Sequence, residues 1–255
     1  MAHGFQYYVD IITVLAQKDL KVRYRNSVLG FVWSLLNPLA YMVILTAVFS
    51  VLLKVAVPNF AAWLLLGLLV WRFFSIATNQ SLTSIIANPS LVTKVYLPRY
   101  LIVLANNLAN LVGATLEFIA LLPLLLFLGV TFSLYAILLP VVLGIEFVLI
   151  FGISLAISAL NLKYRDFSQL WDIALQLGFF VSPIVYDSSF IPARYSFIYS
   201  LNPITRLIQL VRDIFLQKTL PSSYDLGILL TIVILFLVLG LTVFHKLEQR
   251  FAEEL

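Results

Sequence analysis

Residues 21–45, KVRYRNSVLGFVWSLLNPLAYMVIL, join a cluster of positive charge to a long apolar segment. Lys21, Arg23 and Arg25 place three positive charges within five residues, and no charged residue then occurs until Lys54. A helix of about 20 apolar residues is long enough to cross the hydrocarbon core of a bilayer. The stretch therefore predicts a membrane-spanning helix that follows directly after a basic segment.

The composition of the whole chain extends this conclusion. Hydrophobic residues make up 62% of the 255 residues and charged residues only 11%, against about 25% charged residues in a typical soluble domain. Because such a chain cannot cover itself with polar surface in water, its solvent must be lipid. We expect one membrane domain over residues 1–255, without a cleaved signal peptide. The absence of cysteine excludes disulfides and thiolate chemistry.

Six apolar windows are long enough to form spanning helices. They are residues 28–53, 60–81, 100–127, 134–162, 169–186 and 226–245. The fifth window is the shortest and opens with Trp171 and Asp172. Helices are expected because lipid does not tolerate open sheet edges and no strand-like alternation is present. The predicted fold class is an all-α integral membrane protein with six transmembrane helices.

The distribution of Lys and Arg predicts the orientation of these helices. An even number of spans places both termini on the same side of the membrane. If that side is cytoplasmic, most of the 16 Lys and Arg residues face the cytoplasm, and the outer loops are nearly bare except for one long segment. Because cytoplasmic loops carry the excess of positive charge, we predict that both termini lie inside.

Residues 1–27 predict an amphipathic helix that lies on the membrane surface. One face carries apolar residues at helical spacing: Phe5, Tyr8, Val9, Ile12, Leu15 and Ala16. Gln17, Lys18 and Asp19 are expected on the opposite face. Two hypotheses explain such a helix: an anchor on anionic lipid, or a docking surface for a cytoplasmic partner.

Residues 82–98 connect the second and third windows on the cytoplasmic side. Asn88 is suited to cap a new helix and Pro89 to occupy its first turn. Leu91, Val92 and Val95 would give this helix an apolar stripe, which Pro98 ends. Such a helix is either an ordinary connector or an element that transmits force to both spans.

Residues 187–223 are interrupted by prolines, and Asn202-Pro203 again predicts a cap and a first helical turn. The expected apolar face consists of Ile204, Leu207, Ile208, Val211, Ile214 and Phe215. The expected polar face consists of Arg206, Gln209, Arg212 and Asp213. Each half of the segment is too short and too polar to cross, so two re-entrant half-helices on the outer side are predicted. Such helices persist only against protein or a water-filled path.

The charged residues that lie well inside the windows, away from their ends, are Arg72, Glu117 and Glu146. Charges at that depth normally face a partner or a polar path, so an ion pair of Arg72 with one glutamate and the lining of a polar conduit are both open. Catalysis is not expected, because no nucleophile accompanies them and the only histidines are His3 and His245. No metal site and no phosphate-binding loop is predicted either.

Aromatic residues make up 14% of the chain. Trp33, Trp63 and Trp171 are typical of membrane interfaces. Other aromatic residues are placed deeper in a window or nearer to a mouth: Tyr41, Phe49, Phe179, Phe180 and Tyr186. Because sugar rings stack on aromatic rings, a path lined by these side chains would suit a carbohydrate. Packing against lipid explains each of them equally well.

Four segments in order resemble one family. They are KDLKVRYRNSVLGFVWSLLNPL (18–39), NPSLVTKVYLPR (88–99), LNLKYRDFSQLWDIALQLGFFVSPIVY (160–186) and LNPITRLIQLVRDIFL (201–216). The chain resembles the membrane subunits of ATP-binding-cassette exporters of lipid-linked polysaccharides, which serve O-antigen, teichoic acid and capsule. Within them it is most similar to the Wzm-type O-antigen permeases.

The resemblance implies an assembly and a cargo. Two copies of the chain would form the pathway in the bacterial inner membrane, and two copies of a separate ATPase would bind ATP and Mg²⁺ beneath it. The cargo would be an undecaprenyl-linked glycan, and membrane lipid is the other partner. This chain would bind no cofactor and no nucleic acid.

The resemblance also assigns roles to residues. Channel-lining positions would be Trp33, Asn37, Tyr41, Phe49, Phe179, Phe180 and Tyr186. The contact with the ATPase would involve the amphipathic helix and Asn88, Pro89, Leu91, Val92, Lys94, Val95 and Tyr96. The outer gate, within residues 187–223, would contain Pro192, Asn202, Pro203 and Arg206.

Three other functions remain open from the sequence. An exporter of small lipids or drugs would share the architecture, but the aromatic content favours a carbohydrate. A membrane enzyme would need a catalytic cluster that the chain lacks. An ion-coupled carrier would use Glu117 and Glu146 as proton sites.

The basic cluster generates the first prediction. By charge, Lys21, Arg23 and Arg25 suit a lipid pyrophosphate, although anchoring at the inner leaflet explains them too. If they contact the cargo, replacing all three by Gln will lower export more than it lowers membrane insertion. Surface polysaccharide and the membrane-inserted fraction measure the two effects, and equal losses would favour the anchoring role.

Overall fold

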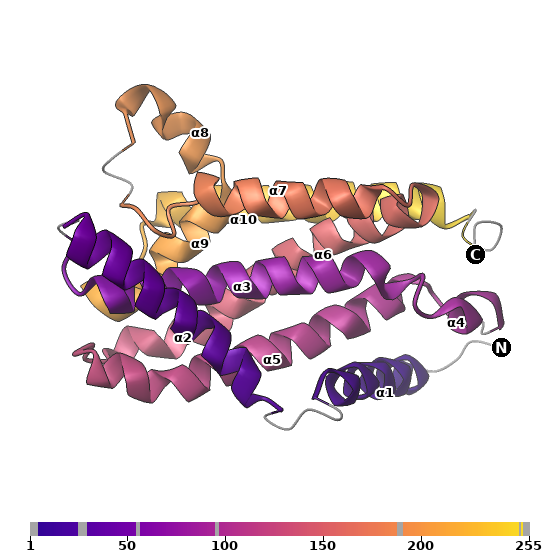
Figure 1. Cartoon of the computed structure of the whole chain (residues 1–255). Coiled ribbons are helices and arrows are strands. Elements are labelled where there is room, and N and C mark those ends of the chain that lie inside the picture. The colour runs from indigo at the N-terminus through magenta and orange to yellow at the C-terminus, as the bar shows by residue number, and fades with distance from the viewer. Residues whose placement is uncertain are drawn as a thin grey trace.

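The computed structural model describes residues 5–24, 30–54, 57–94, 97–187, 191–249 and 251. Within these ranges the regular structure is helical and no strand occurs. The predicted all-α class is therefore confirmed. The long helices run side by side along one bundle (Figure 1).

Five helices in the described part of the chain are long and apolar enough to cross a membrane. They are Val32–Ser50, α3 (Phe60–Ser84), α5 (Tyr100–Phe127), Leu134–Lys163 and α10 (Ser223–Glu248). The first consists of α2 (Val32–Thr46) and most of the π-helical segment η1 (Ala47–Leu52), and the fourth of η2 (Leu134–Leu138) and α6 (Leu139–Lys163). They match five of the six predicted windows to within a few residues.

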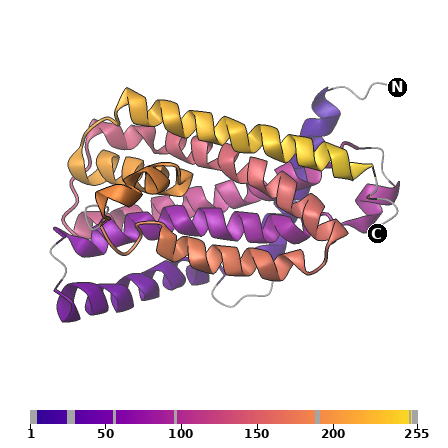
Figure 2. The ribbon, with the colours of Figure 1, turned by 90° about the horizontal axis from the view of Figure 1, so that it is seen from above.

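The remaining window corresponds to α7 (Phe167–Val181), which makes a sixth pass along the bundle (Figure 2). Its 15 residues extend about 22 Å at 1.5 Å per residue, which is less than the ~30 Å of a hydrocarbon core. A turn over residues 182–186 follows directly. A sixth complete crossing therefore stays a prediction.

The two ends of the bundle carry different short elements. One end holds α1 (Phe5–Tyr24), α4 (Pro89–Lys94) and the C-terminal end of α10 (Figure 1). The opposite end holds η4 (Ala193–Tyr195), α8 (Ser196–Ser200), α9 (Pro203–Arg212) and η5 (Asp213–Gln217). An even number of passes would place α1 and the end of α10 together in this way. Which end faces the cytoplasm stays a prediction.

The central element is α3, whose residues are mostly buried and which packs against α2, α5, α6, α7 and α9. A helix that is apolar on all sides is expected at such a position. In contrast, α2 and α10 are mostly exposed, and α7 contains no buried residue. The molecule thus has a firmly packed centre and a lightly packed flank formed by α2 and α7.

The helix α1 packs against α5, and its face differs from the predicted one in two places. Val9 is 41% exposed, although it was expected on the apolar face. Asp19 was expected on the polar face, but its Oδ2 accepts a hydrogen bond of 3.3 Å from Asn106 Nδ2 on α5. The reason is that α5 presents a buried amide, which the helical spacing of α1 alone does not reveal.

The closest helix contact joins α6 to α10. A Cβ added to Gly152 would lie 2.7 Å from Leu237 Cα, and a Cβ on Gly240 would overlap the backbone of Gly152. Glycine lets two helix backbones approach because it has no side chain to exclude. The pair is therefore needed for the α6–α10 interface.

We predict that Gly240→Ala lowers the free energy of unfolding by about 1–3 kcal/mol, the typical range for overpacking. Thermal unfolding of the purified protein in detergent would measure it. Gly227→Ala is the matched control on the same helix, because nothing lies within 4 Å of its added Cβ. It should be neutral or stabilising by up to ~1 kcal/mol, since Ala favours helix more than Gly. Equal effects of the two substitutions would contradict the close contact.

Candidate functional site

A groove of about 440 Å³ lies between α2, α3 and α7. Its lining combines aromatic and polar side chains and includes Asn37, Tyr41, Arg72, Phe179 and Phe180. Four of these were predicted as channel-lining residues from two windows far apart in the sequence. Tyr41 and Phe180 are 54% and 68% exposed, so the groove presents aromatic rings outward.

Three other predicted channel residues lie outside this groove. Trp33 is exposed on α2, and Phe49 stacks on Phe60 with ring centroids 6.3 Å apart. The hydroxyl of Tyr186 lies 3.0 Å from the carbonyl oxygens of Phe180 and Val181. The Tyr186 hydroxyl thus supplies a partner at the C-terminal end of α7, where helix carbonyls have none within the helix. A channel-lining role for all seven residues stays a prediction.

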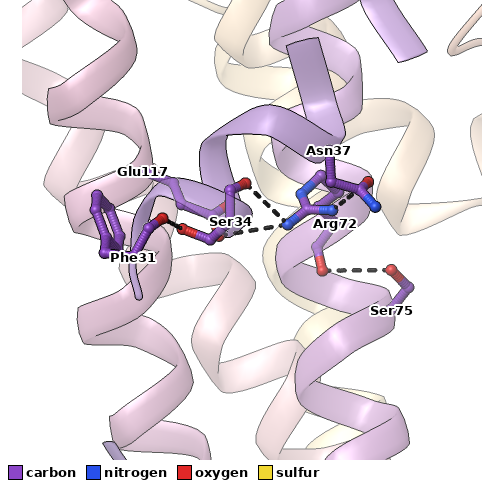
Figure 3. A network of polar contacts seen from close by, with 6 residues as sticks. All are labelled: Phe31, Ser34, Asn37, Arg72, Ser75 and Glu117. Atoms are coloured by element: carbon purple, nitrogen blue, oxygen red, sulfur yellow. Dashed lines mark hydrogen bonds and ion pairs between the residues drawn. The ribbon is translucent and has the colours of Figure 1, made fainter. Parts of the chain in front are cut away.

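The polar side of the groove is organised by Arg72 of α3 (Figure 3). Its Nη1 donates to Asn37 Oδ1 at 2.7 Å, and its Nη2 donates to the Ser34 carbonyl at 3.2 Å. The same Nη2 lies 3.4 Å from Glu117 Oε1 on α5. One guanidinium therefore joins α2, α3 and α5. The predicted pairing of Arg72 with one glutamate is confirmed, and the partner is Glu117.

Glu146 does not belong to this network. It is fully buried in α6, and neither carboxylate oxygen has a hydrogen-bond partner among the described residues. The three intramembrane ionisable residues therefore separate into an ion pair and an isolated carboxyl group. The positions of the two glutamates within their windows could not show which one pairs with Arg72, because the rotation of each helix decides which neighbour its glutamate faces.

The helix α7 is attached to α3 by two polar contacts that the sequence analysis missed. Asn79 Nδ2 donates to Asp172 Oδ1 at 2.7 Å, and Trp171 Nε1 donates to Thr78 Oγ1 at 3.3 Å. Trp171, interpreted from the sequence as an interface residue, also contacts the neighbouring helix. Uncharged polar residues near the end of the second window, such as Asn79, were the available signal.

At the opposite end, α9 begins as predicted. Asn202 Oδ1 accepts a hydrogen bond from the backbone N–H of Ile204 at 3.0 Å, and Pro203 occupies the first turn. Pro192 is exposed, and its carbonyl accepts from the backbone N–H of Tyr195. The predicted cap and first turn are therefore confirmed, whereas a gating role for these residues stays a prediction.

Two arginines of the predicted polar face of α9 are buried against protein. Arg206 and Arg212 are 8% and 5% exposed, because α9 packs against α3, α6 and α10. Arg206 Nη1 pairs with Asp225 Oδ1 of α10 at 2.7 Å. At the end of a bundle, free helix carbonyls and carboxylates need donors, and these arginines supply them.

Arg212 fixes the turn after α7 to the N-terminal end of α3. Its Nη1 and Nη2 donate to the carbonyls of Pro183 and Ile184 at 2.8 and 3.1 Å. Its guanidinium carbon lies 3.3 Å from the ring centroid of Trp63, which is buried. The position of Trp63 at a membrane interface stays a prediction. Burial lowers the pKa of Arg212 to about 9, and the group stays charged at neutral pH.

The predicted contact helix α4 begins at Pro89, as expected, but Asn88 does not cap it with its side chain. Asn88 Oδ1 accepts from Lys18 Nζ of α1 at 2.8 Å, and its Nδ2 donates to the Ser84 carbonyl. The competing donor on α1 explains the difference. Leu91 is half-buried and Val92 is buried.

The remaining predicted positions at this end are described only in part. Lys21 is exposed on the last turn of α1. Arg25, Val95 and Tyr96 lie outside the described residues, as do the side chains of Arg23 and Lys94. Beyond α4, Arg99 Nη1 donates to the Glu248 carbonyl of α10 and its guanidinium lies over the ring of Phe251.

Comparisons with known proteins agree with this architecture. The ABC-2 type transporter family matches residues 11–216. The chain is 36% identical, over 99% of its length and 98% of the relative, to the O-antigen export system permease protein RfbA of Klebsiella pneumoniae. It is 30% identical to the protein of the same name from Myxococcus xanthus, over 97% and 96% of the two chains. It is 23% identical to the polysialic acid transport protein KpsM of Escherichia coli, over 96% of each.

The Arg72 network generates a prediction about stability. We expect Arg72→Gln to lower the free energy of unfolding by roughly 3–5 kcal/mol, because it removes the positive partner of a buried carboxylate. Chemical or thermal unfolding in detergent would measure this. The double variant Arg72→Gln/Glu117→Gln should recover part of the loss.

The matched control is Arg165→Gln, since Arg165 is exposed between α6 and α7. This change should stay within about 0.5 kcal/mol of the parent, as surface substitutions usually do. If the double variant is no more stable than Arg72→Gln, the ion pair does not hold these helices together.

Proposed function

This chain belongs to the ABC-2 type transporter family, and we propose that it is the membrane permease subunit of an ATP-driven exporter of a polysaccharide. Its match to O-antigen export permeases over nearly the full length of both chains carries this proposal. The five long apolar helices make it a multi-pass membrane protein. ATP and Mg²⁺ bind to a separate ATPase subunit, and this chain carries the cargo path.

The groove between α2 and α7 supports a carbohydrate cargo. Tyr41, Phe179 and Phe180 offer ring faces, while Asn37 and Arg72 offer an amide and a guanidinium beside them. A sugar presents apolar C–H faces and hydroxyl groups together, so both kinds of side chain have a partner. We propose an undecaprenyl-linked, O-antigen-like glycan as the cargo. A capsule polysaccharide is the second candidate, because KpsM relatives also match over most of the chain.

We propose that two copies of the chain form the path. A single groove that opens into hydrocarbon would leave a hydrated polymer facing lipid, which is unfavourable for polar groups. The flank that carries the groove is the lightly packed one, and exposed apolar residues such as Ile44, Leu177 and Phe180 border it. A second copy placed against this flank would enclose the path between two grooves. Two ATPase subunits then match the two permeases.

The connections at the α1–α4 end suggest how ATPase movement reaches the path. Lys18 joins α1 to the start of α4, and Arg99 joins the start of α5 to α10. We propose that the ATPase presses on α1 and α4, with both termini inside. A shift there is passed to α3 and α5, which flank α4, and from α3 to α2 and α7 through Arg72 and Asn79. The α8–α9 end would form the outer gate.

The aromatic groove generates the test of this function. In a strain that depends on this permease and its ATPase, Tyr41→Ala/Phe180→Ala should lower surface polysaccharide roughly 30-fold. The reason is that two stacking contacts of about 1 kcal/mol each are removed from the path. Surface glycan and accumulated lipid-linked precursor measure the effect.

Phe127→Ala is the matched control, because Phe127 is 87% exposed at the end of α5 and lies outside the groove. It should leave export unchanged at equal membrane levels of the protein. If the double variant exports polysaccharide at the parent rate, the groove is not the path of the cargo. Transport by the purified permease in vesicles without its ATPase would sink the proposed function itself.

A further inference from the structure

A second cavity, of about 470 Å³, lies on the opposite side of α7 from the groove. It is bordered by α3, α6, α7, α10 and the start of α9, it is partly open to the surroundings, and no charged side chain lines it. Its volume falls within the ~300–1,000 Å³ of typical ligand pockets. Trp71 and Phe74 lie in the middle of α3, so the cavity lies at the depth of the hydrocarbon core.

The cavity exists because small residues meet on its walls. Gly152 and Gly240 bring the backbones of α6 and α10 into contact, and Gly178 lets α7 approach Trp71, where an added Cβ would lie 2.9 Å from the ring. Ala156 and Ala174 complete the walls of α6 and α7. The same glycines that tighten the helix contacts thus leave a space between α7 and α10.

The polar groups on the walls already have partners. Trp171 Nε1 donates to Thr78 Oγ1, and Asn202 joins Ser182 Oγ to the backbone N–H of Ile204. A buried water needs about 2–4 polar partners, and a sugar needs more, so neither is suited to this space. An empty cavity would lose dispersion contacts along its whole lining. A flexible hydrocarbon chain needs no hydrogen bonds and is the solvent at this depth.

We propose that this cavity binds one acyl chain of a bilayer phospholipid, which packs α7 against α6 and α10. No residue of α7 is buried by protein alone, so the acyl chain supplies the contacts that this helix lacks. The position of α7, and with it one wall of the groove, then depends on the surrounding lipid. This site is separate from the cargo path and does not rest on the proposed function.

Photolabelling of the full permease–ATPase complex tests the site without measuring transport. The complex is placed in nanodiscs of phosphatidylethanolamine and phosphatidylglycerol that contain phosphatidylethanolamine with a diazirine in one acyl chain. Labelling of Phe236 on the cavity wall is compared with that of Ile234, which is 58% exposed on the same helix. Ala174→Phe and Ala156→Phe, on opposite walls, should each lower the Phe236-to-Ile234 ratio roughly tenfold, because a ring displaces several methylene groups.

The matched control is Ala120→Phe, which adds the same ring at an exposed position of α5 outside the cavity. It should leave the ratio unchanged. The proposal is overturned if neither filling variant changes the ratio while both still co-purify with the ATPase. It is also overturned if a diazirine-bearing polyprenyl phosphate labels Phe236 and the phospholipid does not, because the occupant then comes from the cargo pool.

Discussion

The arrangement of the groove depends on the hydrogen bonds and the ion pair that the guanidinium of Arg72 makes. In a hydrocarbon environment every buried polar group needs a partner from the protein, and Arg72 finds them on α2 and α5. Because α2 is otherwise mostly exposed, these bonds set its position over α3. The need to satisfy a charge at this depth thereby fixes the distance between α2 and the core of the bundle.

The lightly packed helix α7 is held mainly by contacts near its two ends. Two polar contacts attach it to α3, and Arg212 and Tyr186 hold the turn behind it. Between these fixed points lie the groove on one side and the apolar cavity on the other. A helix attached at its ends and weakly packed along its length can shift laterally without breaking the core of the bundle. This combination suits the wall of a path that must widen and close.

At the α1–α4 end of the bundle, side-chain contacts join α1, α4, α5 and α10. Lys18 and Asn88 join α1 to α4, Asp19 joins α1 to α5, and Arg99 joins the α4–α5 corner to α10. Each contact links segments that are distant in the sequence. A force applied to α1 or α4 is therefore shared by α5 and α10 instead of bending one loop, which is the property that a surface driven by a partner ATPase requires.

The sequence by itself determined the helical class, five of the spans and the start of α9, and it offered an intramembrane ion pair as one of two explanations for Arg72. These follow from apolar length, from Asn-Pro turns and from the free energy of an isolated charge in lipid, all of which are local properties. Only the tertiary structure decided that Glu117 and not Glu146 pairs with Arg72, that Arg206 and Arg212 are buried, and that Asn37 and Phe180 line the same groove. Those outcomes depend on how each helix is rotated against its neighbours, and in lipid apolar residues occur on every side of a helix, so periodicity gives no rotation.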